Sequence, residues 1–421
     1  MTAPQSQYLP LDRLPNQPTA WQLTSTAAHE SCSLQQYKAT RTWQWNDKTI
    51  YFFCDIHADA DAFLLSLAAS GGIEKTGRED HDFELTATGR KALFIIGGDC
   101  FDKGPSTLRL LDLIYCLKQK AADLLLLAGN HDVRTYLGMF YAENQQLMFD
   151  HLFVRMGTKT IPLLEEIYLR FVQPEQRSRR SEESALKARL FPDETWFENF
   201  PTAARTVIRP ASLAKEVRRV REKGPQMEQL VASRGLDFSQ IFQAVQKFKE
   251  LFLEPGSRYR WFFDSLQLAH REGSYLFVHG GMDDSMAQLI ASRGLDHVNQ
   301  SFMDQLKDDP FSLYHGTIGN VFRTKYRSSD YAFTDQGTKL LNGAGIHAIV
   351  HGHLNLTGGQ RLVIRNDMLN FECDSSVDCN TRKLEQLNGP GGAVVIFESD
   401  GTVKGISTDH NQIKTFHPEA E

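Results

Sequence analysis

The sequence predicts an α/β fold in which parallel strands alternate with helices. Three segments have the apolar pattern of buried strands, and two segments between them have helical spacing. The strand segments are 48–55, 91–98 and 123–128, and the helical segments are 60–70 and 106–120. The order strand, helix, strand, helix, strand implies parallel strands joined by right-handed crossovers. In such sheets functional residues gather at the carboxyl ends of the strands.

The ends of these elements are marked by turn residues and by polar side chains. A hairpin over 41–55 feeds the first buried strand, which ends at Asp55. The first helix stops at Gly71 and Gly72. Strand character returns late in the chain, at 274–281, 345–353, 361–367 and 391–407. The last of these segments predicts a hairpin with a turn at Ser399, Asp400 and Gly401.

Composition divides the chain into four parts. Residues 1–40 are rich in Pro, Gln, Ser and Thr and predict an extended arm. Residues 41–140 and 274–421 form the two halves of the α/β core. The part between them, 141–273, reads mostly as helix and predicts an insertion. Within it, residues 155–235 carry 16 Lys and Arg against 11 Asp and Glu, although the whole chain has a net charge of −6.

Overall composition is that of an ordinary globular protein. The acidic balance gives no electrostatic bias toward nucleic acid, and no apolar stretch approaches the roughly 20 residues of a membrane helix. The N-terminus has no secretory signal pattern. The six cysteines contain no Cys-x-x-Cys pair, which is typical of reduced thiols in a cytoplasmic protein.

Five short polar segments follow predicted strands. They are 54–58 (CDIHA), 97–104 (GGDCFDKG), 129–132 (GNHD), 278–281 (VHGG) and 350–355 (VHGHLN). Each alone is weak, because a lone histidine or a Gly-Asn turn is common in cores and loops. Together they present carboxylate, imidazole and amide groups at one edge of a sheet. Such a mixture suits Mn²⁺, Fe or Zn²⁺.

In this order the motifs resemble those of the phosphoprotein phosphatase branch of the calcineurin-like metallophosphoesterases. The match runs over about 43–138 and 274–406 and leaves the helical segment unmatched. The resemblance implies a β-sandwich core flanked by helices, with two divalent metals, Mn most readily, about 3.5–4 Å apart. It implies that Asp55 and His57 bind the first metal and that Asp99 bridges both. The second metal is then completed by Asn130, His279 and His353.

The resemblance also implies a mechanism. A hydroxide bridging the metals attacks phosphorus in line, because a metal lowers the pKa of its water toward ~7. His131 protonates the leaving oxygen, and Asp102 orients His131. For Asp102 the alternative is a helix N-cap ahead of the segment that starts at Ser106.

Substrate phosphate requires a cation beside the metals. Lys103 stands where relatives usually carry Arg. A lysine there would attract the phosphate as a point charge and could not form the two parallel hydrogen bonds that an arginine forms. The family also uses an arginine between the two late histidines. Arg323 is the first choice for it, and Arg327 is the reserve.

The last motif allows two alignments. In the first, His353 is the ligand and Asn355 stands where many metallophosphoesterases have a second histidine. In the second, His351 and His353 form the ligand pair themselves. We favour the first, because the protein-phosphatase branch needs only one histidine there.

The resemblance implies a phosphomonoesterase acting on phosphotyrosine, phosphoserine or phosphothreonine in proteins. The alternatives are a bis(5′-nucleosyl)-tetraphosphatase and, in another class, a non-catalytic phosphoprotein-binding module. Similar bacterial enzymes include effectors delivered into host cells, which is an alternative to a purely cytoplasmic location. The basic insertion is a candidate site for a protein partner. Its arginines form two clusters, made of Arg177, Arg179, Arg180, Arg218, Arg219 and Arg221.

Overall fold

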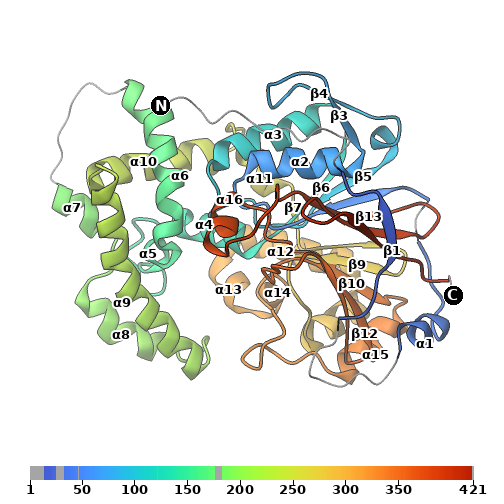
Figure 1. The fold of residues 1–421 in the computed structure, drawn as a ribbon. Helices are drawn as coiled ribbons and strands as arrows, with labels where there is room; N and C mark the ends of the chain where they lie inside the picture. Colours follow the sequence, from blue (N-terminus) through green and yellow to red (C-terminus); the bar gives the residue numbers. More distant parts are fainter. Residues whose placement is uncertain (1–13, 25–32, 46, 121, 176–182, 420–421) are drawn as a thin grey trace. The chain divides into compact units, whose positions relative to one another are not determined.

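The computed structural model describes residues 14–24, 33–45, 47–120, 122–175 and 183–419. The chain divides into two compact units, which we describe separately (Figure 1). The sheet unit comprises Met1–Asn130, Ser265–Asp308 and Gly316–Glu421. The helical unit comprises His131–Asp264 and Asp309–His315.

An eight-stranded sheet forms one layer of the sheet unit. Its strands are, in spatial order, β1 (Gln17–Ala20), β15 (Gln412–Phe416), β14 (Val403–Ser407), β13 (Ala393–Phe397), β2 (Ile50–Phe53), β5 (Leu93–Ile96), β6 (Asp123–Leu127) and β7 (Leu266–Gln267). Strands β2, β5, β6 and β7 pair in parallel, with Phe52 opposite Ile95 and Ile95 opposite Leu125. The predicted parallel arrangement of the first three strand segments is therefore confirmed. The predicted C-terminal hairpin is the antiparallel pair β13 and β14.

A five-stranded sheet forms the second layer. Its strands are, in spatial order, β11 (Arg361–Arg365), β12 (Met368–Glu372), β10 (Ala348–His351), β9 (Tyr275–Val278) and β8 (Ala269–Glu272). One hydrophobic core contains buried side chains from both sheets. Across it, the rings of Phe52 and Phe277 lie 5.7 Å apart. The unit is thus a β-sandwich, and the predicted fold class is confirmed.

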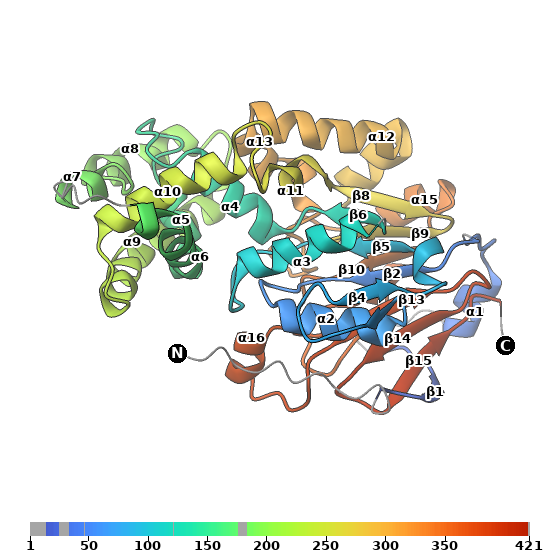
Figure 2. The same ribbon diagram turned by 90° about the horizontal axis from the view of Figure 1, so that it is seen from above.

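Helices cover the two outer faces of the sandwich (Figure 2). On the side of the large sheet lie α2 (Ala60–Ser70), α3 (Thr107–Gln119) and the hairpin of β3 (Ile73–Lys75) and β4 (Phe83–Leu85). On the side of the small sheet lie α12 (Asp284–Asp308) and α15 (Asp335–Gly343). The unit also contains α14 (Thr317–Asn320), α16 (Cys379–Leu384) and a 3₁₀ turn at Gly89–Lys91. Both α2 and α3 start as the sequence predicts, with the side chains of Asp59 and Ser106 accepting backbone N–H groups.

Parts of the predicted N-terminal arm are ordered elements of the sheet unit. Strand β1 extends the large sheet by pairing in parallel with β15. Helix α1 (Leu34–Ala39) buries Tyr37, whose hydroxyl donates to the carbonyl of His347 at 2.7 Å. These contacts fix segments that sequence composition alone assigned to an extended arm.

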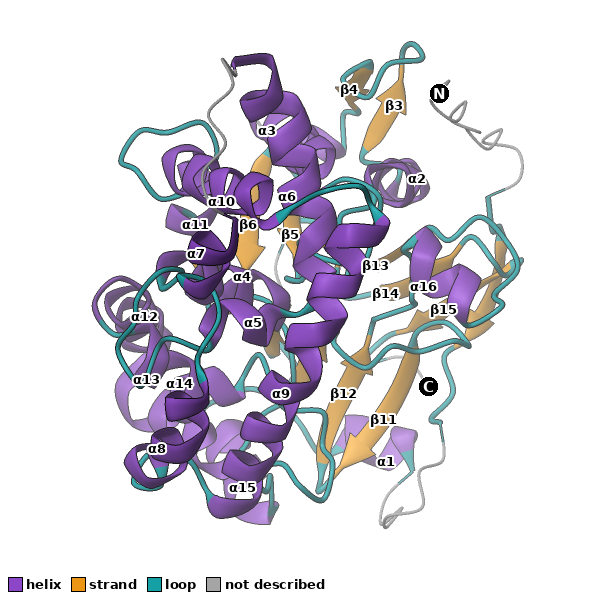
Figure 3. Ribbon diagram, turned by 90° about the vertical axis from the view of Figure 1, so that its left-hand side faces the viewer, coloured by secondary structure: helices purple, strands orange, loops and turns teal. Residues whose placement is uncertain are grey.

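The helical unit has no strand among its described residues (Figure 3). Its helices are α4 (Asn130–Phe140), α5 (Leu152–Met156), α6 (Ile161–Ile167), α7 (Glu183–Ala188), α8 (Glu194–Ala204), α9 (Pro210–Ser233), α10 (Phe238–Phe252), α11 (Arg260–Asp264) and α13 (Pro310–His315). Short 3₁₀ and π turns lie at Thr158–Thr160, Tyr168–Val172 and Gln173–Glu175. Helix α10 packs on α6 and α7, and α9 packs on α5 and α8. Nothing in the sequence pattern indicated that α13 would join this unit.

Two further expectations from composition can be compared with the structure. Within the described residues no helix has the length and apolar character needed to cross a membrane. Cysteines 54, 100, 116, 373 and 379 are free thiols, and Cys32 lies outside the described residues.

Candidate metal centre

The loops that follow β2 and β5 are held together by their backbones. The amides of Asp55, His57 and Ala58 donate to the carbonyls of Gly98, Asp99 and Cys100 at 3.1, 2.9 and 2.9 Å. Because β2 and β5 are parallel neighbours, these hydrogen bonds place the two aspartates side by side at the carboxyl edge of the sheet.

Backbone strain is concentrated in the motif segments. More than half of the described non-glycine residues with positive φ lie there: Asp55, His57, Ala58, Asp99, Asp102, Lys103, His353 and Asn355. Each left-handed conformation costs roughly 1–3 kcal/mol and persists only when its surroundings impose it. Such strain clusters at functional sites, so this distribution supports a functional role for the loops.

The small sheet supplies two histidines to the same place. His279 follows β9 and His353 follows β10, and the amide of Gly352 donates to the carbonyl of His279 at 2.9 Å. The amide of His353 donates to Asp55 Oδ2 at 2.8 Å, which joins the two sheets. A Cβ on Gly352 would lie only 1.9 Å from that Oδ2 atom, so the Gly-His pair of the motif is a steric requirement.

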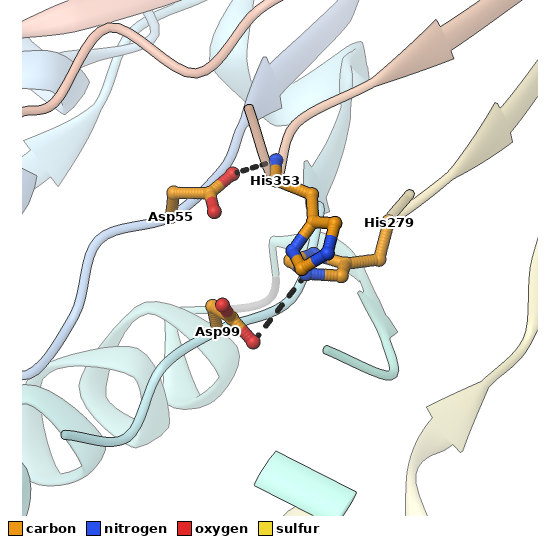
Figure 4. A group of neighbouring side chains, drawn as sticks. All are labelled: Asp55, Asp99, His279 and His353. Atoms are coloured by element: carbon orange, nitrogen blue, oxygen red, sulfur yellow. Dashed lines mark hydrogen bonds and ion pairs between the residues drawn. The ribbon is translucent and has the colours of Figure 1, made fainter. Parts of the chain in front are cut away.

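These loops bring all six predicted ligands together. One potential ligand atom from each of Asp55, Asp99, His279 and His353 lies within 4.8 Å of the others, and all four residues are buried (Figure 4). The remaining two candidates border this group. His57 Nε2 lies 3.7 Å from Asp99 Oδ2 and 3.9 Å from Asp55 Oδ1. Asn130 Oδ1 lies 3.4 Å from His279 Nε2.

Each of the three histidines hydrogen-bonds one ring nitrogen to a backbone carbonyl. His57 Nδ1 lies 3.2 Å from the carbonyl of Phe101, and His279 Nδ1 lies 2.8 Å from that of Gly97. His353 Nε2 lies 3.3 Å from the carbonyl of Arg323. A carbonyl can only accept, so each of these nitrogens carries a proton. In a neutral ring the other nitrogen then offers its lone pair. In His57 and His279 that nitrogen lies beside the carboxylates, and His353 Nδ1 lies 3.2 Å from His279 Nε2.

Buried negative charge gives the site an affinity for cations. Burial raises the pKa of Asp55 to about 8, and the charges of Asp374 and Asp99 add to this effect. Burial lowers the pKa of His279, but Asp99 and Asp55 outweigh it and the pKa rises to about 9. Without a cation the group therefore holds protons. The oxygen and nitrogen donors fit a divalent metal ion, which would take the place of those protons.

Lys103 reaches the edge of the group. Its Nζ lies 2.7 Å from His57 Nε2 and 3.3 Å from Asn355 Oδ1. The side chain of Asn380 donates to the Lys103 carbonyl at 2.5 Å and holds the loop. The ammonium group thus lies beside the ring nitrogen of His57 that faces the carboxylates.

The two arginine candidates lie in the loop that follows α14. Arg323 donates from its guanidinium to the Gly319 carbonyl at 2.9 Å and to Asn320 Oδ1 at 2.6 Å, within its own loop. Its carbonyl is the one that orients His353. Arg327 is exposed and pairs with Asp330 at 3.2 Å.

Sequence reasoning missed two charged residues near the group. Lys325 is half-buried, and its ammonium interacts electrostatically with Asp55, Asp374 and Asp99. Asp374 is 2 % exposed and accepts the backbone amides of Asn355 and Ser376. The position of Asp374 just after a strand could have indicated a site residue, but strand β12 was not recognised in the sequence. No local sequence feature distinguishes Lys325 from its arginine neighbours as the residue near the carboxylates.

The two histidines of the last motif have different surroundings. His353 belongs to the group of four, whereas His351 is fully buried at the end of β10. Its Nδ1 lies 3.0 Å from the Gly352 carbonyl, and burial lowers its pKa to about 4. The side-chain oxygen of Asn355 accepts a hydrogen bond from Lys103 Nζ at 3.3 Å.

Asp102 and His131 are both buried. Asp102 lies in the loop after β5 with a φ of +67°. The N-cap of α3 is Ser106, whose hydroxyl accepts the Arg109 amide at 3.1 Å, so Asp102 does not serve as the cap. His131 is the second residue of α4 and directly follows Asn130.

Residues 48–216 match the family model described as calcineurin-like phosphoesterase. The match covers the segments of Asp55, Asp99 and Asn130 and extends into α9, further than the motifs alone indicated. It ends before His279 and His353, which the motifs predicted and which the structure brings beside Asp55 and Asp99.

Comparison with curated proteins finds no match. Among solved structures, the chain is similar to a cold-active protein-tyrosine phosphatase of a psychrophile Shewanella sp., with 14% identity and a TM-score of 0.45 over 94% of this chain and 90% of that chain. It is also similar to a protein serine/threonine phosphatase from Saccharomyces cerevisiae, with 14% identity and a TM-score of 0.39 over 92% and 87% of the two chains.

Proposed function

We propose that this protein is a metal-dependent phosphomonoesterase that acts on phosphoproteins. The observation that carries the proposal is the arrangement of His57, His279 and His353, each of which hydrogen-bonds one ring nitrogen to a backbone carbonyl. All three lie in the same buried group as Asp55 and Asp99. Such second hydrogen bonds are what metal-binding histidines typically make. Bound at this site, two divalent ions, Mn²⁺ first and Fe or Zn²⁺ as alternatives, would polarise the phosphoryl group and supply a nucleophile at neutral pH.

The geometry supports a division of the residues between two ions. Asp99 faces both sides, since its Oδ2 lies 3.7 Å from His57 and its Oδ1 lies 3.4 Å from His279. We assign one ion to Asp55 and His57 and the bridge to Asp99. The second ion would then be held by Asn130, His279 and His353. An anionic bridge is needed because two cations so close together repel each other.

Two lysines provide positive charge for the substrate. Lys103 and Lys325 both lie near the carboxylates, and each can attract a phosphate oxygen as a point charge. This assigns to Lys325 the role expected of Arg323 or Arg327. His131 would donate a proton to the leaving oxygen, with Asp102 as the acid that orients it.

The substrate class rests on the form of the motifs, GDxxDKG and HGG, which favour phosphoproteins. The test is a side-by-side turnover measurement with phosphotyrosine, phosphoserine and phosphothreonine peptides and with diadenosine tetraphosphate, all in the presence of Mn²⁺. We expect at least one phosphopeptide to be hydrolysed with a higher kcat/KM than diadenosine tetraphosphate. A preference for the dinucleotide would identify the tetraphosphatase instead. If the protein binds phosphopeptides but hydrolyses none of the substrates, it is a phosphoprotein-binding module and not an enzyme.

A further inference from the structure

The helical unit contains a buried ion pair that belongs to no predicted site. Arg155 of α5 and Glu216 of α9 form an ion pair, and the two residues are only 9% and 8% exposed. The two helices pack against each other (Figure 3). Residues spaced by three or four along a helix share a face, so Arg219 and Lys223 follow Glu216 along α9.

Lys223 is a second cation close to Arg155. Its Nζ donates to the carbonyl of Arg155 at 2.6 Å and to that of Met156 at 3.3 Å, at the C-terminal end of α5. Both acceptors are neutral. The side chain is half-buried, and Arg219 beside it is half-buried as well.

Positive charge exceeds negative charge at this place. Glu216 is engaged by Arg155, and among the described residues neither Arg219 nor Lys223 forms an ion pair with an acidic side chain. Burial lowers the pKa of Lys223 to about 7, and the charges of Arg155, Arg134 and Arg219 add to this effect. Burial and the charge of Arg155 also lower the pKa of Arg219.

The exposed arginines of α9, unlike Arg219 and Lys223, pair with acidic side chains. Arg218 lies 3.8 Å from Glu222, and Arg221 lies 3.4 Å from Glu194. Both side chains are more than half exposed, so solvent and a carboxylate balance their charge. The other predicted basic cluster, Arg177, Arg179 and Arg180, lies outside the described residues. The uncompensated charge is therefore on the half-buried pair.

We propose that Arg219 and Lys223, supported by the Arg155–Glu216 ion pair, form a binding site for a phosphate oxyanion in the helical unit. A partly buried excess of positive charge is costly, and an anion offsets that cost. A guanidinium supplies directed N–H donors for a tetrahedral oxyanion, and an ammonium adds a point charge. The anion is either free inorganic phosphate or a phosphate ester on a peptide.

The site is tested by calorimetric titration of the full-length protein, with its metals in place, with inorganic phosphate. Arg219→Gln and Lys223→Gln should remove one class of binding site or weaken it about tenfold or more, as expected for the loss of a charge-assisted hydrogen bond. The matched control is Arg218→Gln, which removes the same charge from an exposed neighbour and should leave binding unchanged. Lys223→Arg keeps the charge and should retain binding. Thermal unfolding without phosphate verifies that each variant is folded.

Two further titrations distinguish the source of the anion. A peptide carrying a phosphonate, which cannot be hydrolysed, should show the same dependence on Arg219 if the site takes phosphate esters. If only inorganic phosphate depends on Arg219, the site takes the free ion. Equal binding by wild type, control and test variants would overturn the proposal, and so would phosphate binding at the metal centre alone.

Discussion

Asp99 is the residue on which the proposed centre depends most, because its two oxygens face different histidines. We expect Asp99→Asn to lower the affinity for both metals, since the neutral amide no longer offsets two adjacent cations. Metal content after dialysis, measured by elemental analysis, should fall below two ions per chain, and turnover should fall with it. Asp123→Asn serves as control, because Asp123 is exposed at the start of β6. Two ions bound at unchanged affinity would show that Asp99 is not the bridge.

His131 should affect the rate without affecting the metals. For His131→Asn we expect the full metal content and a turnover reduced by roughly 10²–10⁴, the usual contribution of a general acid. The reduction should be smaller for para-nitrophenyl phosphate than for a phosphoserine peptide, because a good leaving group needs less protonation. An equal reduction for both substrates would count against His131 as the proton donor.

At the scale of the element, α5 and α8 enclose a histidine that no predicted site uses. His151 is fully buried and packs against the rings of Trp196 and Phe200, at centroid distances of 4.8 and 4.6 Å. Neither of its ring nitrogens has a hydrogen-bond partner among the described residues. Burial lowers its pKa to about 3. Below a pH of about 6.5, the ordinary pKa of histidine, His151 binds a proton in the unfolded chain but stays neutral in the folded chain. The free energy of unfolding therefore falls as the pH falls from about 6.5 toward 3.

Replacing His151 with phenylalanine should remove this dependence. From the pKa difference we expect the wild-type group to cost about 2 kcal/mol of unfolding free energy between pH 7 and pH 5. In His151→Phe that loss should be absent, because no proton is taken up in either state. Urea unfolding at the two pH values measures it, with the exposed His297→Gln as control. A similar loss in wild type and His151→Phe would contradict the assignment.

At the scale of the whole molecule, metal removal is the broadest test. Treatment with a chelator should abolish turnover, and Mn²⁺ should restore it first, because the donors are oxygen and nitrogen only. The melting temperature should fall on removal, since a ligand that binds only the folded state stabilises it. Turnover that persists in metal-free protein would refute the proposed chemistry.

The sequence by itself determined the core and the candidate ligands. Apolar runs such as 93–96 have few alternatives to a buried strand, and the residue after each run must lie at the edge of the sheet. For this reason the strand pattern predicted that Asp55 and Asp99 lie near each other. His279 follows a strand of the second sheet, so its place beside them was implied only by the resemblance of the motifs to a known family.

Only the tertiary structure decided which other side chains face the site. In the loop of Arg323, Lys325 and Arg327, three cations alternate within five residues. The side chain of Arg323 donates to Asn320 and that of Arg327 pairs with Asp330, whereas Lys325 interacts electrostatically with the buried carboxylates. Strand β1 was missed because its four mostly exposed residues become a strand only by pairing with β15, far away in sequence. The basic insertion could be recognised by counting charges, but burial distinguishes Arg219 from Arg218. The direction of a side chain, the pairing of distant strands and the burial of a residue all depend on the packed chain. They cannot be read from a short stretch of sequence.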